Sequence, residues 1–204
     1  MRKTAIAVAI IGLFVVPALA QTPPAPAPVR VRGTVEKLDG QNLTVKSRDG
    51  QSLAIALAPN IIVSYLTKKN AGDIKTGDFV ASTGIKGTDG KLHAIEVRIF
   101  PENLRGVGEG QYPWDLKPDS IMTNATVGTI TKSPQGNVVK VSYKGSESEF
   151  TIDPDTPVYG TATDGDTSLL KPGVAVFVIA QKQDDGKMTS SRLYTEKDGI
   201  KPSM

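Results

Sequence analysis

The sequence predicts an all-β protein of two tandem small β-barrels joined by a long ordered linker. Apolar and polar residues alternate in short runs, as in Val31-Arg32-Gly33-Thr34-Val35, and this period of two is typical of half-buried strands. Asp-Gly turns separate the runs, because glycine accepts the positive φ that tight hairpin turns require. No stretch has convincing helical periodicity, although residues 66–75 could hold one short helical turn. The same series of motifs then occurs twice, which predicts two copies of one domain.

Residues 1–20 are predicted to be a cleaved secretory signal peptide. The positive start, MRK, precedes an apolar run at residues 5–16, and Ala18-Leu19-Ala20 fits the small-residue rule for signal peptidase. The apolar run is shorter than the roughly 20 residues that a membrane-spanning helix needs, so we expect no membrane span in the mature chain. A bacterial periplasmic or secreted location follows. Residues 21–28, QTPPAPAP, are expected to form an extended Pro/Ala-rich tether.

The composition excludes several classes of function. The formal net charge of +3 includes Arg2 and Lys3 of the predicted signal peptide, so the mature chain carries about +1. Such a charge gives no broad attraction to nucleic acid or to an anionic membrane. The chain has no cysteine, which excludes disulfides, zinc-thiolate sites and cysteine nucleophiles. His93 is the only histidine, which removes most acid–base and nucleophilic schemes that use imidazole. We expect a non-catalytic protein without a cofactor, and a monomer.

The first predicted barrel comprises residues 29–100. Three alternating runs are joined into a meander by turns at Asp39-Gly40 and Asp49-Gly50. After the short apolar run Ile61-Ile62-Val63, a glycine turn precedes a strand at residues 79–85, and a last hairpin leads to residue 100. Five or six strands with turns about every 8 to 12 residues indicate a sandwich or a barrel. Closing so small a sheet into a five-stranded OB-like barrel removes its exposed edges.

The second predicted barrel, residues 125–196, repeats these motifs at an offset of 95 to 96 residues. An ordered series at nearly constant spacing predicts an internal duplication, and residues 197–204 are left as a polar, frayed tail. The motifs recur as follows: Gly33-Thr34-Val35 as Gly128-Thr129-Ile130, Pro59-Asn60 as Pro154-Asp155, Ile74-Lys75-Thr76-Gly77 as Leu170-Lys171-Pro172-Gly173, and Asp89-Gly90-Lys91-Leu92 as Asp185-Gly186-Lys187-Met188.

This pattern resembles the secreted bacterial domains of unknown function that have an OB-like β-barrel. The early Gly-Thr-Val strand, the Asp-Gly hairpins and the Ile/Leu-Lys-Thr/Pro-Gly turn carry the resemblance, which covers residues 31–100 and 125–194. The resemblance implies export and a barrel fold. It implies no catalytic residues, because the shared motifs are structural.

Residues 101–124 connect the two predicted barrels and contain the only tryptophan, Trp114. This segment is much longer than the usual connection of about 4 to 6 residues. Its candidate ligand-binding residues are Arg105, Tyr112, Trp114 and Asp115, since an arginine beside a Tyr-Pro-Trp set suits a glycan or a peptide. The favoured alternative is a structural clasp, in which Trp114 is buried between the barrels and Asp115 caps backbone amides.

Acidic turns provide a second candidate site. Asp164 and Asp166 flank Gly165, and Asp184 and Asp185 precede a glycine, so their oxygens could ligate calcium. Aspartate beside glycine is also ordinary turn chemistry, and no run has EF-hand spacing. We therefore favour turn residues over metal ligands. For His93 we likewise favour a half-packed residue at the rim of a barrel over a lone metal ligand.

These observations together predict an exported, non-catalytic binding or envelope-associated module. Its expected partner is an envelope protein, a glycan or a small ligand, and nucleic acid is not expected. A periplasmic metal-handling protein that uses the acidic turns is the alternative. An enzyme comes third, because no two carboxylates are paired as a glycoside hydrolase would require.

Overall fold

The structure is a computed structural model that describes residues 27–163 and 165–203, so the predicted signal peptide and most of the tether lie outside it. The described chain is all-β, with short 3₁₀ helices between some of the strands. The elements are β1 (Val29–Asp39), β2 (Asn42–Ser47), β3 (Ser52–Lys69), η1 (Ala71–Asp73), β4 (Phe79–Lys86), β5 (Leu92–Ile99), η2 (Glu102–Leu104), β6 (Gly110–Pro113), β7 (Ile121–Ser133), β8 (Gly136–Tyr143), β9 (Ser146–Ile152), β10 (Val158–Thr163), η3 (Thr167–Leu169), β11 (Ala175–Lys182) and β12 (Met188–Thr195). In the part of the chain described, none of the helices has the length and apolar character needed to cross a membrane.

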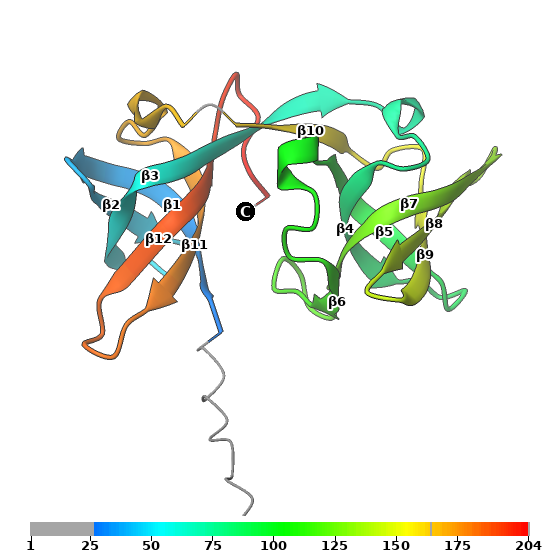
Figure 1. Ribbon diagram of the computed structural model, residues 1–204, viewed down its shortest axis with the longest axis horizontal. Coiled ribbons are helices and arrows are strands. Elements are labelled where there is room, and N and C mark those ends of the chain that lie inside the picture. The colour runs from blue at the N-terminus through cyan, green and yellow to red at the C-terminus, as the bar shows by residue number, and fades with distance from the viewer. Residues whose placement is uncertain (1–26, 164, 204) are drawn as a thin grey trace, which may run out of the picture.

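The strands form one 12-stranded sheet that rolls up into two lobes (Figure 1). In barrel I the order is β12-β11-β1-β2-β3, and a parallel pairing of β12 with β3 closes this five-stranded barrel. In barrel II the order is β5-β4-β7-β8-β9, and β5 meets β9 at the single pair His93 and Thr151. Strand β10 pairs with both β3 and β5 and so links the two barrels.

The strands do not group as the predicted boundaries 29–100 and 125–196 require. Barrel I combines β1, β2 and β3 with the hairpin β11–β12, whereas barrel II combines the hairpin β4–β5 with β7, β8 and β9. The physical reason is the length of β3, whose 18 residues run on past barrel I and pair with β10 across the top of the molecule (Figure 1). The end of β3 therefore lies near barrel II, and the β4–β5 hairpin that follows it in the chain becomes part of barrel II.

Strand β3 joins two apolar runs that the sequence separates at Pro59. Leu57 pairs with β12 before this proline and Ile62 pairs with β12 after it, while the residues between them have no partner in the register. Proline lacks the N–H that a paired position would use, so it is tolerated in this interruption. A strand break predicted from Pro59 alone would thus be wrong.

Each barrel has its own apolar core, built from the inward half of the alternation. In β2, Leu43 and Val45 are fully buried in barrel I, while the residues between and beside them are more exposed. Phe150 is the largest fully buried side chain and belongs to the core of barrel II. Burying each such side chain contributes about 1.5–3 kcal/mol. Gly33 is required where β1 crosses β2, because a Cβ there would lie 2.0 Å from the Lys46 carbonyl oxygen.

The C-terminal segment is docked between the barrels, so the prediction of a frayed tail is wrong (Figure 1). Lys197 and Ile200 form a β-bridge, and Pro202 is buried. The Ser203 hydroxyl hydrogen-bonds with the side chains of Glu96 and Arg98 in β5. The polar composition of the tail suggested fraying. However, Ser203 of the tail finds hydrogen-bond partners in the buried Glu96–Arg98 ion pair of β5, which lies 105 or more residues away in the sequence.

The pairing of the hairpins can be tested with engineered disulfides, since the chain has no native cysteine. Thr34 in β1 faces Ala175 in β11, and strand neighbours of this kind lie within the Cα separation of about 4.4–6.8 Å that a disulfide needs. We expect the variant Thr34→Cys/Ala175→Cys to form an intrachain disulfide, seen as faster migration on a non-reducing gel.

The matched control is Thr34→Cys/Phe79→Cys. A barrel closed within residues 29–100 would bring these two positions together, whereas in the structure Phe79 pairs with Thr126 of barrel II. Cross-linking of the control pair in the monomer, with no bond in the test pair, would show that the hairpins pair within residues 29–100 and 125–196 instead.

Candidate binding site between the two barrels

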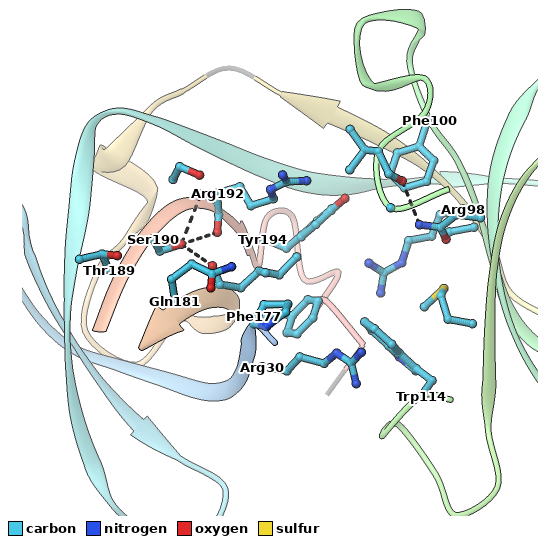
Figure 2. Close-up of a pocket in the computed structure, with 18 of the residues that line it drawn as sticks. Arg30, Arg98, Phe100, Trp114, Phe177, Gln181, Thr189, Ser190, Arg192 and Tyr194 are labelled. Carbon is cyan, nitrogen blue, oxygen red and sulfur yellow. Dashed lines mark hydrogen bonds between the residues drawn. The ribbon is translucent and has the colours of Figure 1, made fainter. Parts of the chain in front are cut away.

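A cavity of about 780 Å³ lies between the barrels. Its walls come from β1, β3, β11 and β12 of barrel I, from β4, β5 and β7, and from the segment that connects β5 to β7 (Figure 2). This volume is in the range of about 300–1,000 Å³ that is usual for small-molecule sites. The position follows from the strand pairing, because the hairpins β4–β5 and β11–β12 and the paired strands β3 and β10 hold the two barrels side by side.

Aromatic rings form a continuous wall of this cavity. Trp114 packs edge-on against Phe177 of β11, with ring centroids 6.0 Å apart, and Phe177 stacks on Tyr194 of β12 at 6.2 Å. On its other side Trp114 meets Tyr112 of β6 at 6.1 Å. Such edge-to-face and offset arrangements are favourable for aromatic pairs. Burial raises the pKa of Tyr112 and Tyr194, so both hydroxyls stay neutral at ordinary pH.

Two arginines of β1 fasten the connecting segment to barrel I. The Arg30 guanidinium lies 4.0 Å from the centroid of the Trp114 ring (Figure 2), and the Arg32 guanidinium lies 4.5 Å from that of Phe177. Arg32 donates two hydrogen bonds to the Asp115 carboxylate, at 2.7 and 2.8 Å. Partial burial by itself would raise the pKa of Asp115, but Arg32 and Arg30 outweigh it and hold this pKa below its ordinary value. The carboxylate is therefore ionised and paired.

The structure brings three of the four sequence-predicted candidates together. Tyr112 and Trp114 line the cavity, and Asp115 lies beside it, where it binds arginine side chains of β1. Trp114 is half-buried, so it packs between the barrels as a clasp would and also faces the cavity. Arg105 lies elsewhere: its Nε is 2.6 Å from Glu102 and its Nη2 donates to the Gly77 carbonyl oxygen.

Other residues of the site were not predicted from the sequence, because they lie on strands with an ordinary alternating pattern. The cavity is also lined by Arg30, Arg98, Phe177, Arg192 and Tyr194. In the sequence each of these occupies one position of an alternating strand, and nothing local marks it as part of a site. Two arginines at alternate positions of β1 were the one available signal, but their acidic partner lies 83 residues away.

The acidic turns have structural roles. Asp166 accepts a hydrogen bond from the Ser168 amide at the start of η3, and Asp185 accepts one from the Lys187 amide and pairs with the Lys187 ammonium. Asp184 is exposed, and Asp164 lies outside the described residues. Within residues 27–163 and 165–203, no three His, Cys, Asp or Glu side chains are grouped in a way that could hold a metal ion.

His93 lies at the seam that completes barrel II, away from the cavity. Its Nδ1 is 3.0 Å from Asp153 at the end of β9, and its Nε2 is 3.3 Å from Asp89 in the preceding turn. Hydrogen bonds to Asp153 and then to Asp89 raise the pKa of His93, against the opposing effect of partial burial. When protonated, the imidazole thus forms an ion pair that links β5 to Asp153, directly after β9.

We expect this link to make the stability of barrel II depend on pH. Because the pKa of His93 is higher in the folded state, its contribution is fully present below the unfolded pKa of about 6.5 and is lost as the pH rises through the folded value. The difference in unfolding free energy between the wild type and His93→Gln should therefore be larger at about pH 5.5 than at about pH 8.5. Asp153→Asn should give the same trend, and a difference that does not change with pH would contradict the assignment.

The cavity thus combines an aromatic wall, arginine side chains and contributions from both barrels, whereas the acidic turns and His93 lie outside it. Comparisons of the chain with protein-family models, with curated proteins and with solved structures found no match.

Proposed function

We propose that this chain is an exported, non-catalytic binding module that takes a small ligand in the cavity between the barrels. The observation that carries the proposal is the cavity itself, whose wall of Trp114, Phe177 and Tyr194 offers stacking surfaces to a ligand. Apolar and aromatic walls with a few polar groups are typical of ligand sites. Asn124 supplies one such group: it is 7% exposed, and its Oδ1 has no hydrogen-bond partner among the described residues.

A binding role fits the residues of the cavity better than catalysis does. Its lining includes no aspartate, glutamate or histidine among the described residues. General acid–base catalysis needs a side chain that can exchange a proton near neutral pH, and arginine does not do so. His93, with both ring nitrogens near carboxylates, lies at the seam of barrel II instead.

We further propose that the two barrels derive from a duplicated domain and that the mature protein is periplasmic or secreted. The eight-residue strands β4 and β5 have eight-residue counterparts in β11 and β12, which begin at the positions that the repeated motifs predict. If so, the copies have exchanged their last hairpins within one chain. The location rests on the signal-like pattern of residues 1–20.

The binding proposal can be tested with an uncharged fluorescent probe, N-phenyl-naphthylamine, and the full mature chain. Trp114 is the only tryptophan, so quenching of its emission by energy transfer to the bound dye reports binding near the cavity. Ala56 of β3 lines the cavity and Ala54, two residues earlier on the same face of the strand, does not. We expect Ala56→Phe to weaken dye binding about tenfold and Ala54→Phe to leave it within about twofold.

Both alanines are exposed, so neither substitution should unfold the protein. The proposal would be wrong if the wild type did not bind the dye, or if the two variants behaved alike.

A further inference from the structure

We infer that the ligand is an amphipathic organic anion, with an apolar body against the aromatic wall and one acidic group that Arg192 binds. The inference rests on the proposed function and names the chemical class of its ligand. Carboxylate, sulfonate and phosphate groups share the required chemistry, which is two or more anionic oxygens that a guanidinium can bind together.

The charged side chains that line the cavity are all arginines. Arg30 shares Asp115 with Arg32, and Arg98 is paired with Glu96. Arg192 is the exception, because it is exposed and has no ion pair with any residue in the described ranges. Arg192 therefore adds an uncompensated positive charge to the net charge of +1 that Arg30, Arg32 and Asp115 carry together.

The corresponding position of barrel II shows that this charge is not a requirement of the fold. Glu96 is the fifth residue of β5, as Arg192 is the fifth residue of β12. Two residues further on, Glu96 has the arginine that neutralises it, whereas Arg192 has Tyr194. The same strand position thus bears a paired anion in one barrel and an unpaired cation in the other.

A β-bulge directs this part of β12 toward the cavity. The registers of β12 with β11 and with β3 both shift next to Ser190, and the buried Ser190 hydroxyl lies 2.8 Å from the carbonyl oxygens of Ile179 and Arg192. In a regular strand, successive side chains point to opposite faces, but here Ser190, Ser191 and Arg192 all line the cavity. Bulges of this kind commonly redirect a side chain at a binding site.

The rest of the cavity suits the apolar part of such a ligand. Trp114, Phe177, Ile179 and Met122 line it, and in Figure 2 Arg192 lies on the far side of Tyr194 from Trp114. A flat ring system placed against the aromatic wall could therefore extend its acidic group to Arg192. A neutral ligand would form no ion pair with the Arg192 guanidinium.

Two dyes with the same ring skeleton test the inference on the full mature chain. Anilinonaphthalene sulfonate carries one sulfonate, and N-phenyl-naphthylamine is its uncharged parent. We expect the sulfonate to bind about tenfold more tightly than the parent, and Arg192→Gln to remove that advantage, so that the two dyes bind this variant alike. Arg48→Gln, at an exposed arginine that does not line the cavity, is the control for net charge and should change neither affinity.

The results separate the inference from the proposed function. If both dyes bound equally and Arg192→Gln had no effect, the anionic class would be wrong while the cavity would still be a binding site. If Arg48→Gln weakened the sulfonate as much as Arg192→Gln did, the effect would be one of net charge and the inference would also fail. If neither dye bound, the proposed function itself would fail. Once the class is supported, competition by a fatty acid, an aromatic carboxylate or an organic phosphate would identify the natural acidic group.

Discussion

Replacing Trp114 with alanine is expected to lower the free energy of unfolding by about 2–4 kcal/mol and to abolish dye binding in the cavity. A fully buried tryptophan would cost about 3–5 kcal/mol, but Trp114 is only half-buried. Its stacking with Arg30 and its edge-on contact with Phe177 add to the loss, because these contacts join the connecting segment to barrel I. Chemical denaturation followed by far-ultraviolet circular dichroism measures this loss.

Trp114→Phe is the matched control, because it keeps a ring at the same place. We expect it to retain most of the stability and to bind the dyes, although energy transfer from tryptophan disappears and dye emission must be read directly. An unchanged unfolding free energy in Trp114→Ala, together with lost binding, would mean that Trp114 is only a ligand platform. The opposite result, lost stability with intact binding, would mean that it is only a clasp.

Replacing Glu96 with alanine is expected to destabilise the protein by about 3–5 kcal/mol. Glu96 and Arg98 are each 9% exposed and form an ion pair between the barrels, to which the Ser203 hydroxyl adds hydrogen bonds. Removing one partner of a buried pair leaves the other charge without compensation, and this loss far exceeds the net value of the pair. The Tyr194 ring, 5.2 Å from the Arg98 guanidinium, cannot replace the carboxylate.

Two further variants make this expectation specific. Glu96→Ala/Arg98→Met removes both charges and should recover much of the lost stability, as buried pairs replaced by apolar residues often do. Arg192→Ala, at the same position of β12, should change the unfolding free energy by no more than about 0.5 kcal/mol, because Arg192 is exposed and forms no ion pair with the residues that the structure describes. Equal effects of Glu96→Ala and Arg192→Ala would contradict the contrast between the two barrels.

The sequence by itself determined which segments are strands and where most of them turn. Side-chain alternation places Leu43 and Val45 in a core, and Asp-Gly pairs at residues 39–40, 49–50 and 89–90 end their strands. Both signals are local: alternation reports which face of one strand is buried, and glycine at positive φ reports a turn. The sequence also identified the connecting segment as a candidate site, because it is much longer than a simple hairpin turn and contains the only tryptophan.

Only the tertiary structure decided which strands pair and therefore where the site lies. The hairpins β4–β5 and β11–β12 have the same length, and their strand patterns do not say which barrel each of them completes. That choice depends on the continuation of β3 past Pro59, where it pairs with β10 from the other half of the chain. The cavity, the pairing of Arg32 with Asp115 and the docked tail all result from contacts between residues far apart in sequence, which no local pattern encodes.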